Sequence, residues 1–182
     1  MKVSGKIIQI DASPKNSLRA KTHLVTKSQF GSKDLEKIIK TMIETLSKEE
    51  DGVAIAAPQI GLSLRMFVVS PNAYPEETRS KPLVFINPKI VKKSKKTAVM
   101  QEGCLSVRWV YGKTKRSVSA TIEAYDSNGN KFSYGGTDLI AHIFQHETDH
   151  LEGVLFIDHG FDLEEFTEEQ VREGNKLRNK EK

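Results

Sequence analysis

The sequence predicts an α+β fold in one domain. Two segments, residues 35–46 and 138–152, place their apolar residues at helical spacing. Short apolar segments separated by turn residues lie between and around them, and such segments are typical of strands. Two good helices combined with short strands favour an α+β arrangement, and 182 residues suit a single domain.

The composition is that of a globular chain with a well-solvated surface. Hydrophobic residues make up 37% and charged residues 29%, and 28 basic against 24 acidic residues give a net charge of +4. This mild charge is compatible with a transient ribosome contact but predicts no specific nucleic-acid site. No apolar run is long enough to span a bilayer, so no membrane contact is expected. Residues 1–11 lack a secretory signal and the single cysteine excludes an intramolecular disulfide, so the expected location is cytoplasmic.

The first half of the chain contains one amphipathic helix and one buried strand. Apolar residues form a single stripe through residues 35–46, and Asp51 and Gly52 are expected to end that helix. The segment 52–61 is too small in its side chains for ordinary core and too apolar for an ordinary loop. Residues 65–70 are typical of a buried strand, and a polar loop with three prolines follows.

The second half contains the other predicted strands. Residues 83–86 are a strand candidate. A hairpin or loop rich in lysine follows it, with Lys92, Lys93, Lys95 and Lys96. Residues 118–125 and 131–134 flank an Asn-Gly turn and predict a β-hairpin.

The chain closes with the second predicted helix and a charged tail. Thr137 can cap a helix over residues 138–152, and Gly153 is placed to end it. The tail has a capping-box pattern at residues 167–170 but few apolar residues beyond it, which predicts only a short last helix.

The strongest chemical signal lies inside the second helix. His146 and His150 are four residues apart, so both imidazoles lie on one face and can reach a single cation. Glu147 is offset around the helix, where it can reach a water molecule on the same metal. Leu139 and Ile143 continue the stripe of the histidines, so the pair is expected to face the interior. Two ligands beside a general base are typical of a metallohydrolase.

The residues alone leave the third ligand open. Cys104 is one candidate because a thiolate binds zinc or ferrous iron strongly, although a lone cysteine is more often a small buried residue. A third histidine is out of register, since Phe156 stands where it is needed and His159 lies beyond. A tail glutamate is another candidate and would make the protein a zinc endopeptidase. The tail offers Glu164, Glu165, Glu168 and Glu169.

Three segments together resemble the signature motifs of the peptide deformylase family. They are GVAIAAPQ at residues 52–59, EGCLS at 102–106 and QHETDH at 145–150. Their order and spacing also look like that family, and the similarity extends from Ile7 to Phe161. Agreement of all three by chance is negligible, so the resemblance is specific.

The resemblance implies a fold, a division of the chain and an activity. Antiparallel strands would pack around a central helix that carries the HETDH motif. Residues 1–163 would form the catalytic domain, and residues 164–182 a charged C-terminal tail with a short helix. The implied reaction is hydrolysis of the N-formyl group from the formylmethionine of newly made polypeptides, with release of formate. The implied cofactor is one divalent metal ion, ferrous iron (Fe2+) natively, with zinc, nickel or cobalt as substitutes.

The resemblance also carries over roles for individual residues. The metal ligands would be Cys104, His146 and His150. Glu147 would be the general base and acid, while Gln59 and the backbone N–H of Leu105 would stabilise the oxyanion. The substrate-binding residues would be Gly52, Val53, Ala54 and Ile143, although tight packing explains the same side chains. Glu102 and Arg116 would form an ion pair that fixes the cysteine segment.

The chain departs from the family pattern at two places. Ala54 stands where a glycine is usual, so its methyl group could narrow the substrate groove. Arg108 stands where a proline is common, and Trp109 follows it. This second departure leaves open the path of the groove rim next to Leu105.

A binding protein with a purely structural metal is the remaining alternative. It could contact ribosomal RNA through the lysine-rich segment at residues 92–96. A structural site normally has four protein ligands, whereas the motifs supply three and leave Glu147 without a role. The enzyme interpretation is therefore preferred.

Overall fold

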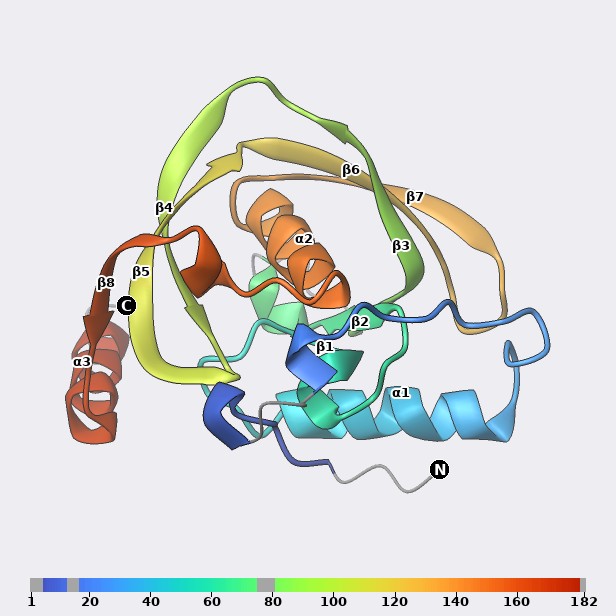
Figure 1. Cartoon of the computed structure of the whole chain (residues 1–182), viewed down its shortest axis with the longest axis horizontal. Helices are drawn as coiled ribbons and strands as arrows, with labels where there is room; N and C mark the ends of the chain where they lie inside the picture. The colour runs from blue at the N-terminus through green and yellow to red at the C-terminus, as the bar shows by residue number, and fades with distance from the viewer. Residues whose placement is uncertain (1–4, 13–16, 75–80, 181–182) are drawn as a thin grey trace.

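The computed structural model describes residues 5–12, 17–74 and 81–180 and confirms the predicted α+β class. Helix α2 (Asp138–Leu151) lies at the centre, with two antiparallel sheets curved around it and helix α1 (Lys33–Leu46) beneath (Figure 1). A third helix, α3 (Glu168–Lys180), lies at one edge of the molecule, beside the last strand. The HETDH motif is therefore on the helix that both sheets surround.

The larger sheet has five strands in the order β1-β2-β3-β6-β7, and each neighbouring pair is antiparallel. These strands are β1 (Ala54–Ala56), β2 (Met66–Val69), β3 (Leu83–Lys93), β6 (Ser119–Tyr125) and β7 (Lys131–Thr137). In β6 every second residue is buried, as expected for a strand with one face on a core. Ile122 of β6 packs in one apolar cluster with Phe144 and Leu151 of α2, so the sheet and the helix share a core.

The smaller sheet has the order β4-β5-β8 and carries the cysteine segment. Its strands are β4 (Thr97–Cys104), β5 (Val107–Ser117) and β8 (Phe161–Glu165). Cys104 pairs with Val107, so Leu105 and Ser106 form the tight turn between β4 and β5. This hairpin places Cys104 beside α2.

Helix α1 begins where the sequence predicts and ends earlier. Ser32 accepts a hydrogen bond from the backbone N–H of Leu35 at 3.2 Å and caps the first turn. The buried stripe of α1 packs under β1 and β2 in a second apolar cluster. The helix stops at Leu46 and not at Asp51 and Gly52, because turns lead the chain from Leu46 to Gly52.

Strands β3 and β7 and the last helix are longer than predicted, whereas β2 and β6 are slightly shorter. Lys92 and Lys93 belong to β3 and not to a loop, because β3 extends through both residues. The hairpin is β6 and β7, and Gly153 follows α2 with φ +78°. The capping box forms, since the N–H of Thr167 donates to Gln170 at 2.8 Å and the reverse contact is 3.3 Å. Strand β8 runs across residue 163, and the division of the chain at that residue stays a prediction. Within the described ranges, no helix combines the length and apolar character needed to cross a membrane.

Candidate active site

Three side chains that can bind a metal meet between the β4–β5 hairpin and α2. Cys104 Sγ lies 3.2 Å from His150 Nε2, and the ligand atoms of these two residues and His146 all lie within 4.8 Å of one another. The imidazole rings of His146 and His150 are 4.9 Å apart because the residues are one turn apart on α2. One thiolate and two imidazoles so arranged fit a single zinc or ferrous ion with an open position.

The position of Cys104 depends on close packing at the end of β4. A Cβ at Gly103 would lie 2.7 Å from Tyr111 Cε1, so this strand can approach Tyr111 only with glycine there. The thiol accepts from the backbone N–H of Ser106 at 3.4 Å and from Gln59 Nε2 at 3.6 Å. The turn and its neighbours therefore aim Sγ at the two histidines.

Glu102 is the centre of a buried hydrogen-bond network behind the histidines. Its carboxylate lies 2.5 Å from His146 Nδ1 and 2.6 Å from His142 Nε2. Arg116 donates to both carboxylate oxygens, at 2.7 and 2.9 Å, and the Thr114 hydroxyl also contacts Glu102. Burial alone would raise the pKa of the Glu102 carboxyl, but the bonds from His142, His146 and Arg116 outweigh it and hold the pKa well below its usual range.

The pKa values of Cys104, His146 and Glu147 are also shifted. Burial opposes ionisation of Cys104, but the charges and hydrogen bonds of His150 and His146 lower the pKa of its thiol to about 5. Burial would lower the pKa of His146, but Cys104 and Glu102 raise it. Burial raises the pKa of Glu147, and the two histidines only partly offset this effect. The thiol is therefore set to ionise, whereas Glu147 is set to hold a proton more readily than a solvated glutamate.

Gln59 lies on a short 3-10 helix, η3 (Ala57–Ile60), at the end of the GVAIAAPQ segment. The backbone N–H of Ala56 donates to Gln59 Oε1 at 2.8 Å, which assigns the orientation of the side-chain amide. Its Nε2 donor then points toward Cys104, and it donates to the Ser106 hydroxyl at 3.3 Å. The amide N–H groups therefore face the cysteine of the cluster.

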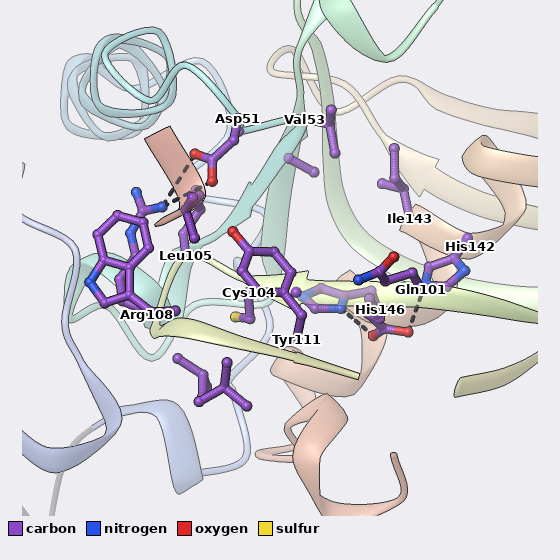
Figure 2. Close-up of a pocket in the computed structure, with 18 of the residues that line it drawn as sticks. Asp51, Val53, Gln101, Cys104, Leu105, Arg108, Tyr111, His142, Ile143 and His146 are labelled. Atoms are coloured by element: carbon purple, nitrogen blue, oxygen red, sulfur yellow. Dashed lines mark hydrogen bonds and ion pairs between the residues drawn. The ribbon is translucent and has the colours of Figure 1, made fainter. Parts of the chain in front are cut away.

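A cavity of about 410 Å³ opens beside this cluster. One wall is the segment 51–54, the other is the β4–β5 hairpin, and α2 closes the base. Figure 2 shows Val53 and Ile143 across the cavity from Cys104. Glu147 lines the cavity, and its Oε2 is buried with no hydrogen-bond partner among the described residues. Such an unpaired oxygen is expected where a water molecule or ligand binds.

The structure brings most of the predicted site residues together around this cavity. Those that line it are Gly52, Val53, Ala54, Gln59, Glu102, Cys104, Leu105, Ile143, His146 and Glu147. His150 is buried behind the cysteine, and Arg116 lies behind Glu102. The tail glutamates are not part of the metal-binding cluster found among the described residues, so the endopeptidase donor set is not supported.

Several cavity residues were not predicted, and two groups of them are informative. His142 is one turn before His146 on α2, and this spacing was the signal that could have identified it. The second group comes from the C-terminal segment and contains Phe166, Gln170, Val171 and Gly174. No sequence pattern links that segment to the motifs, because only the pairing of β8 with β5 brings it to the cavity.

The fold and the site define a class of protein, a hydrolase with one cysteine and two histidines of a helix placed where they could hold a metal ion. Comparison with known proteins agrees with this class. The profile of the polypeptide deformylase family matches residues 6–166. The chain is 42% identical over 146 residues to the peptide deformylase of Borreliella burgdorferi, covering 80% of this chain and 83% of that protein. It is 36% identical to peptide deformylase 1 of Vibrio vulnificus, covering 94% and 98% of the two chains.

Solved structures give the same result. The class I type b peptide deformylase from Acinetobacter baumannii, determined with Met-Ala-Ser bound, superposes with a TM-score of 0.75 and 27% identity. The match covers 85% of this chain and 97% of that one. The chain therefore belongs to the polypeptide deformylase family, and the prediction of an enzyme of this family is confirmed.

Proposed function

We propose that the protein removes the N-formyl group from the formylmethionine of newly made polypeptides and releases formate. The observation that carries this proposal is a buried, unpaired carboxylate oxygen of Glu147 at a cavity that also contains the Cys104 and His146 ligand atoms. The Acinetobacter baumannii relative binds Met-Ala-Ser, a peptide that begins with methionine, and this supports a methionine peptide as substrate.

The metal ligands in this proposal are Cys104, His146 and His150. Their thiolate and imidazole donors fit ferrous iron, and also zinc, nickel or cobalt. A divalent ion held there would supply an activated water, whose pKa falls from about 15.7 toward 7 on coordination. Glu102 would orient His146, and Arg116 would hold Glu102 in place.

The remaining chemistry falls to residues of the chain that face the cavity. Glu147 would take the proton of the attacking water and return it to the leaving amine, and its raised pKa suits both steps. Gln59 Nε2 and the backbone N–H of Leu105 would donate hydrogen bonds to the formyl oxygen as negative charge develops on it. The amide N–H groups do not titrate, so this stabilisation would not depend on pH.

The substrate would lie along the wall formed by Gly52, Val53 and Ala54. Ile143 would receive the methionine side chain from the α2 side of the cavity. We place the reaction in the cytoplasm, where ribosomes make the substrate. The net charge of +4 is compatible with a transient ribosome contact.

A formate-release assay on formyl-Met-Ala-Ser tests this proposal, with metal analysis of protein purified without oxygen. We expect formate and free Met-Ala-Ser as products, with the peptide bonds intact. Cys104→Ala should lose both metal and activity. Cleavage of peptide bonds, or full metal content in Cys104→Ala, would contradict the proposed site.

A further inference from the structure

Arg108 joins the two walls of the cavity through a cluster of ion pairs. Its Nη1 lies 3.2 Å from both carboxylate oxygens of Asp51, and its Nη2 contacts Glu49. Arg108 and Asp51 both line the cavity, and Figure 2 shows the bridge between them at one side of it. The acidic partners precede Gly52, whereas Arg108 follows Leu105 on the opposite wall. The bridge therefore spans the groove.

The side chains of this cluster are partly shielded from water. The exposed fractions are 22% for Arg108, 26% for Glu49 and 32% for Asp51. The planar guanidinium contacts two carboxylates at once and also lies 5.2 Å from the centre of the Trp109 ring. A guanidinium group that contacts two carboxylates restricts the relative positions of all three side chains more than a single surface ion pair does.

The backbone at position 108 is tied to the N-terminal segment as well. The N–H of Arg108 donates to Gln9 Oε1 at 3.3 Å, and Gln9 Nε2 donates to the carbonyl of Leu105 at 3.0 Å. A proline at this position would have no N–H to donate. This hairpin wall thus uses a backbone N–H that any residue except proline provides.

Trp109, which follows Arg108 on the rim of the groove, has an unfavourable backbone conformation. Its φ is +67°, in the left-handed region that bulky residues rarely adopt. The Trp109 carbonyl accepts a hydrogen bond from the N–H of Phe166 at 2.8 Å, and the Arg108 side chain lies against the Trp109 ring. Such a strained conformation persists only where surrounding contacts hold it. Strained conformations of this kind are concentrated at functional sites.

We propose that Arg108 is a positioning residue that sets the width of the substrate groove for the peptide residues that follow the methionine. The inference rests on the proposed deformylase function. Loss of the bridge would free the segment 49–53 to move away from Leu105, so a longer peptide would bind less well. The chemistry would not change, because the contacts of Arg108 join the groove walls and do not include the metal ligands.

The test compares Arg108→Met with wild type on formyl-Met amide and formyl-Met-Ala-Ser. We expect KM for the longer peptide to rise about tenfold with kcat unchanged, and a smaller effect on the short substrate. High salt should raise the wild-type KM part of the way toward the mutant value, because the ion pairs of Arg108 are only partly shielded from the solvent. Lys113→Met is the matched control, since it removes the exposed Lys113–Asp162 ion pair of the same strand away from the cavity.

A double-mutant cycle with Asp51→Asn separates positioning from general destabilisation. If Arg108 acts through Asp51, the double variant should be no worse than Arg108→Met. Calorimetric binding of Met-Ala-Ser to the metal-loaded proteins gives a second readout that does not need turnover. An unchanged KM and peptide affinity in Arg108→Met, or a loss confined to kcat, would overturn the proposal. Failure of the proposed function would be seen separately, as absence of formate release by the wild type.

Discussion

Glu102 Oε1 lies 2.5 Å from Nδ1 of His146, inside a network that Arg116 completes. The pKa of Glu102 is held well below its usual range, so the carboxylate is ionised and can only accept; Nδ1 must carry the proton. When the ring is neutral, as a metal-binding imidazole must be, the other ring nitrogen, Nε2, would carry the lone pair for the metal. One buried carboxylate therefore decides which tautomer the ligand adopts.

Glu102→Gln should weaken both metal binding and folding. The amide keeps the shape of the side chain but removes the charge that Arg116 faces in the interior. Breaking one side of a buried ion pair costs about 3–5 kcal/mol. Denaturant unfolding measures the loss of stability, and competition with a chelator measures metal affinity. Asp162→Asn, which alters only an exposed ion pair, is the control and should match wild type. Equal stability and metal affinity in Glu102→Gln would contradict the role of the network.

The same carboxylate predicts how stability depends on pH. Its pKa is lower in the folded protein than the value of about 4.3 in the unfolded chain, so its contribution is fully present above that value and declines as the pH falls below it. The decline should approach about 1.4 kcal/mol per pH unit for this group. The difference in unfolding free energy between metal-free wild type and metal-free Glu102→Gln should shrink as the pH falls below about 4.3. A difference that grows in acid would reverse the sign and refute the argument.

Glu147→Gln should keep the metal and lose most of the deformylase activity. Glutamine preserves the shape, but it cannot accept the proton of the attacking water. Loss of a general base costs on the order of 10²-fold or more in kcat. The measurement is kcat for formate release at equal metal content, determined for each preparation. Wild-type turnover in this variant would exclude the base role.

Activity should be sensitive to oxygen when iron is bound and more durable with nickel or cobalt. The reason is the single thiolate of Cys104, since both ferrous iron and a thiolate beside it can be oxidised. Half-lives in air of protein loaded with each metal provide the check, with samples kept without oxygen as the control. Identical half-lives for the iron and nickel forms would count against this prediction.

The enzyme should act on formylated N-termini and not on acetylated ones. Formyl carries only hydrogen on its carbonyl carbon, so it can approach between Gln59 and Leu105, whereas acetyl adds a methyl group. One methyl group in a permissive apolar pocket changes binding by only about 1–3 kcal/mol, so larger discrimination requires a rigid wall. We expect Ala54, which is buried in β1 and lines the cavity, to form part of that wall. The measurement is kcat/KM for formyl-Met-Ala-Ser and acetyl-Met-Ala-Ser. Comparable values for the two peptides would contradict the steric argument.

The strands β4 and β5 show where sequence patterns fail. Residues 112–116 alternate between buried and exposed, as a strand should, but the buried side chains at 114 and 116 are threonine and arginine. In β4 the apolar Val99 is exposed and Glu102 is buried. The usual apolar alternation is therefore inverted, because these strands face a polar network and not an apolar core.

The sequence by itself determined the elements whose signals are local. His146, Glu147 and His150 are placed by the period of one helix, and the β6–β7 hairpin by its Asn-Gly turn. The three motifs together also identified the family. Each of these follows from residues that are near one another in the chain or from a pattern with fixed spacing.

Only the tertiary structure decided which distant residues meet at the site. The bridge from Arg108 to Asp51 joins residues far apart in the sequence, and the pairing of β8 with β5 brings Phe166 to the cavity. Charged and aromatic side chains are common on any protein surface. The residue type alone therefore does not predict which other residue a side chain will contact. These contacts arise when the two sheets pack around α2. They are stabilised by the many interactions of the whole fold and not by residues that are near one another in the chain.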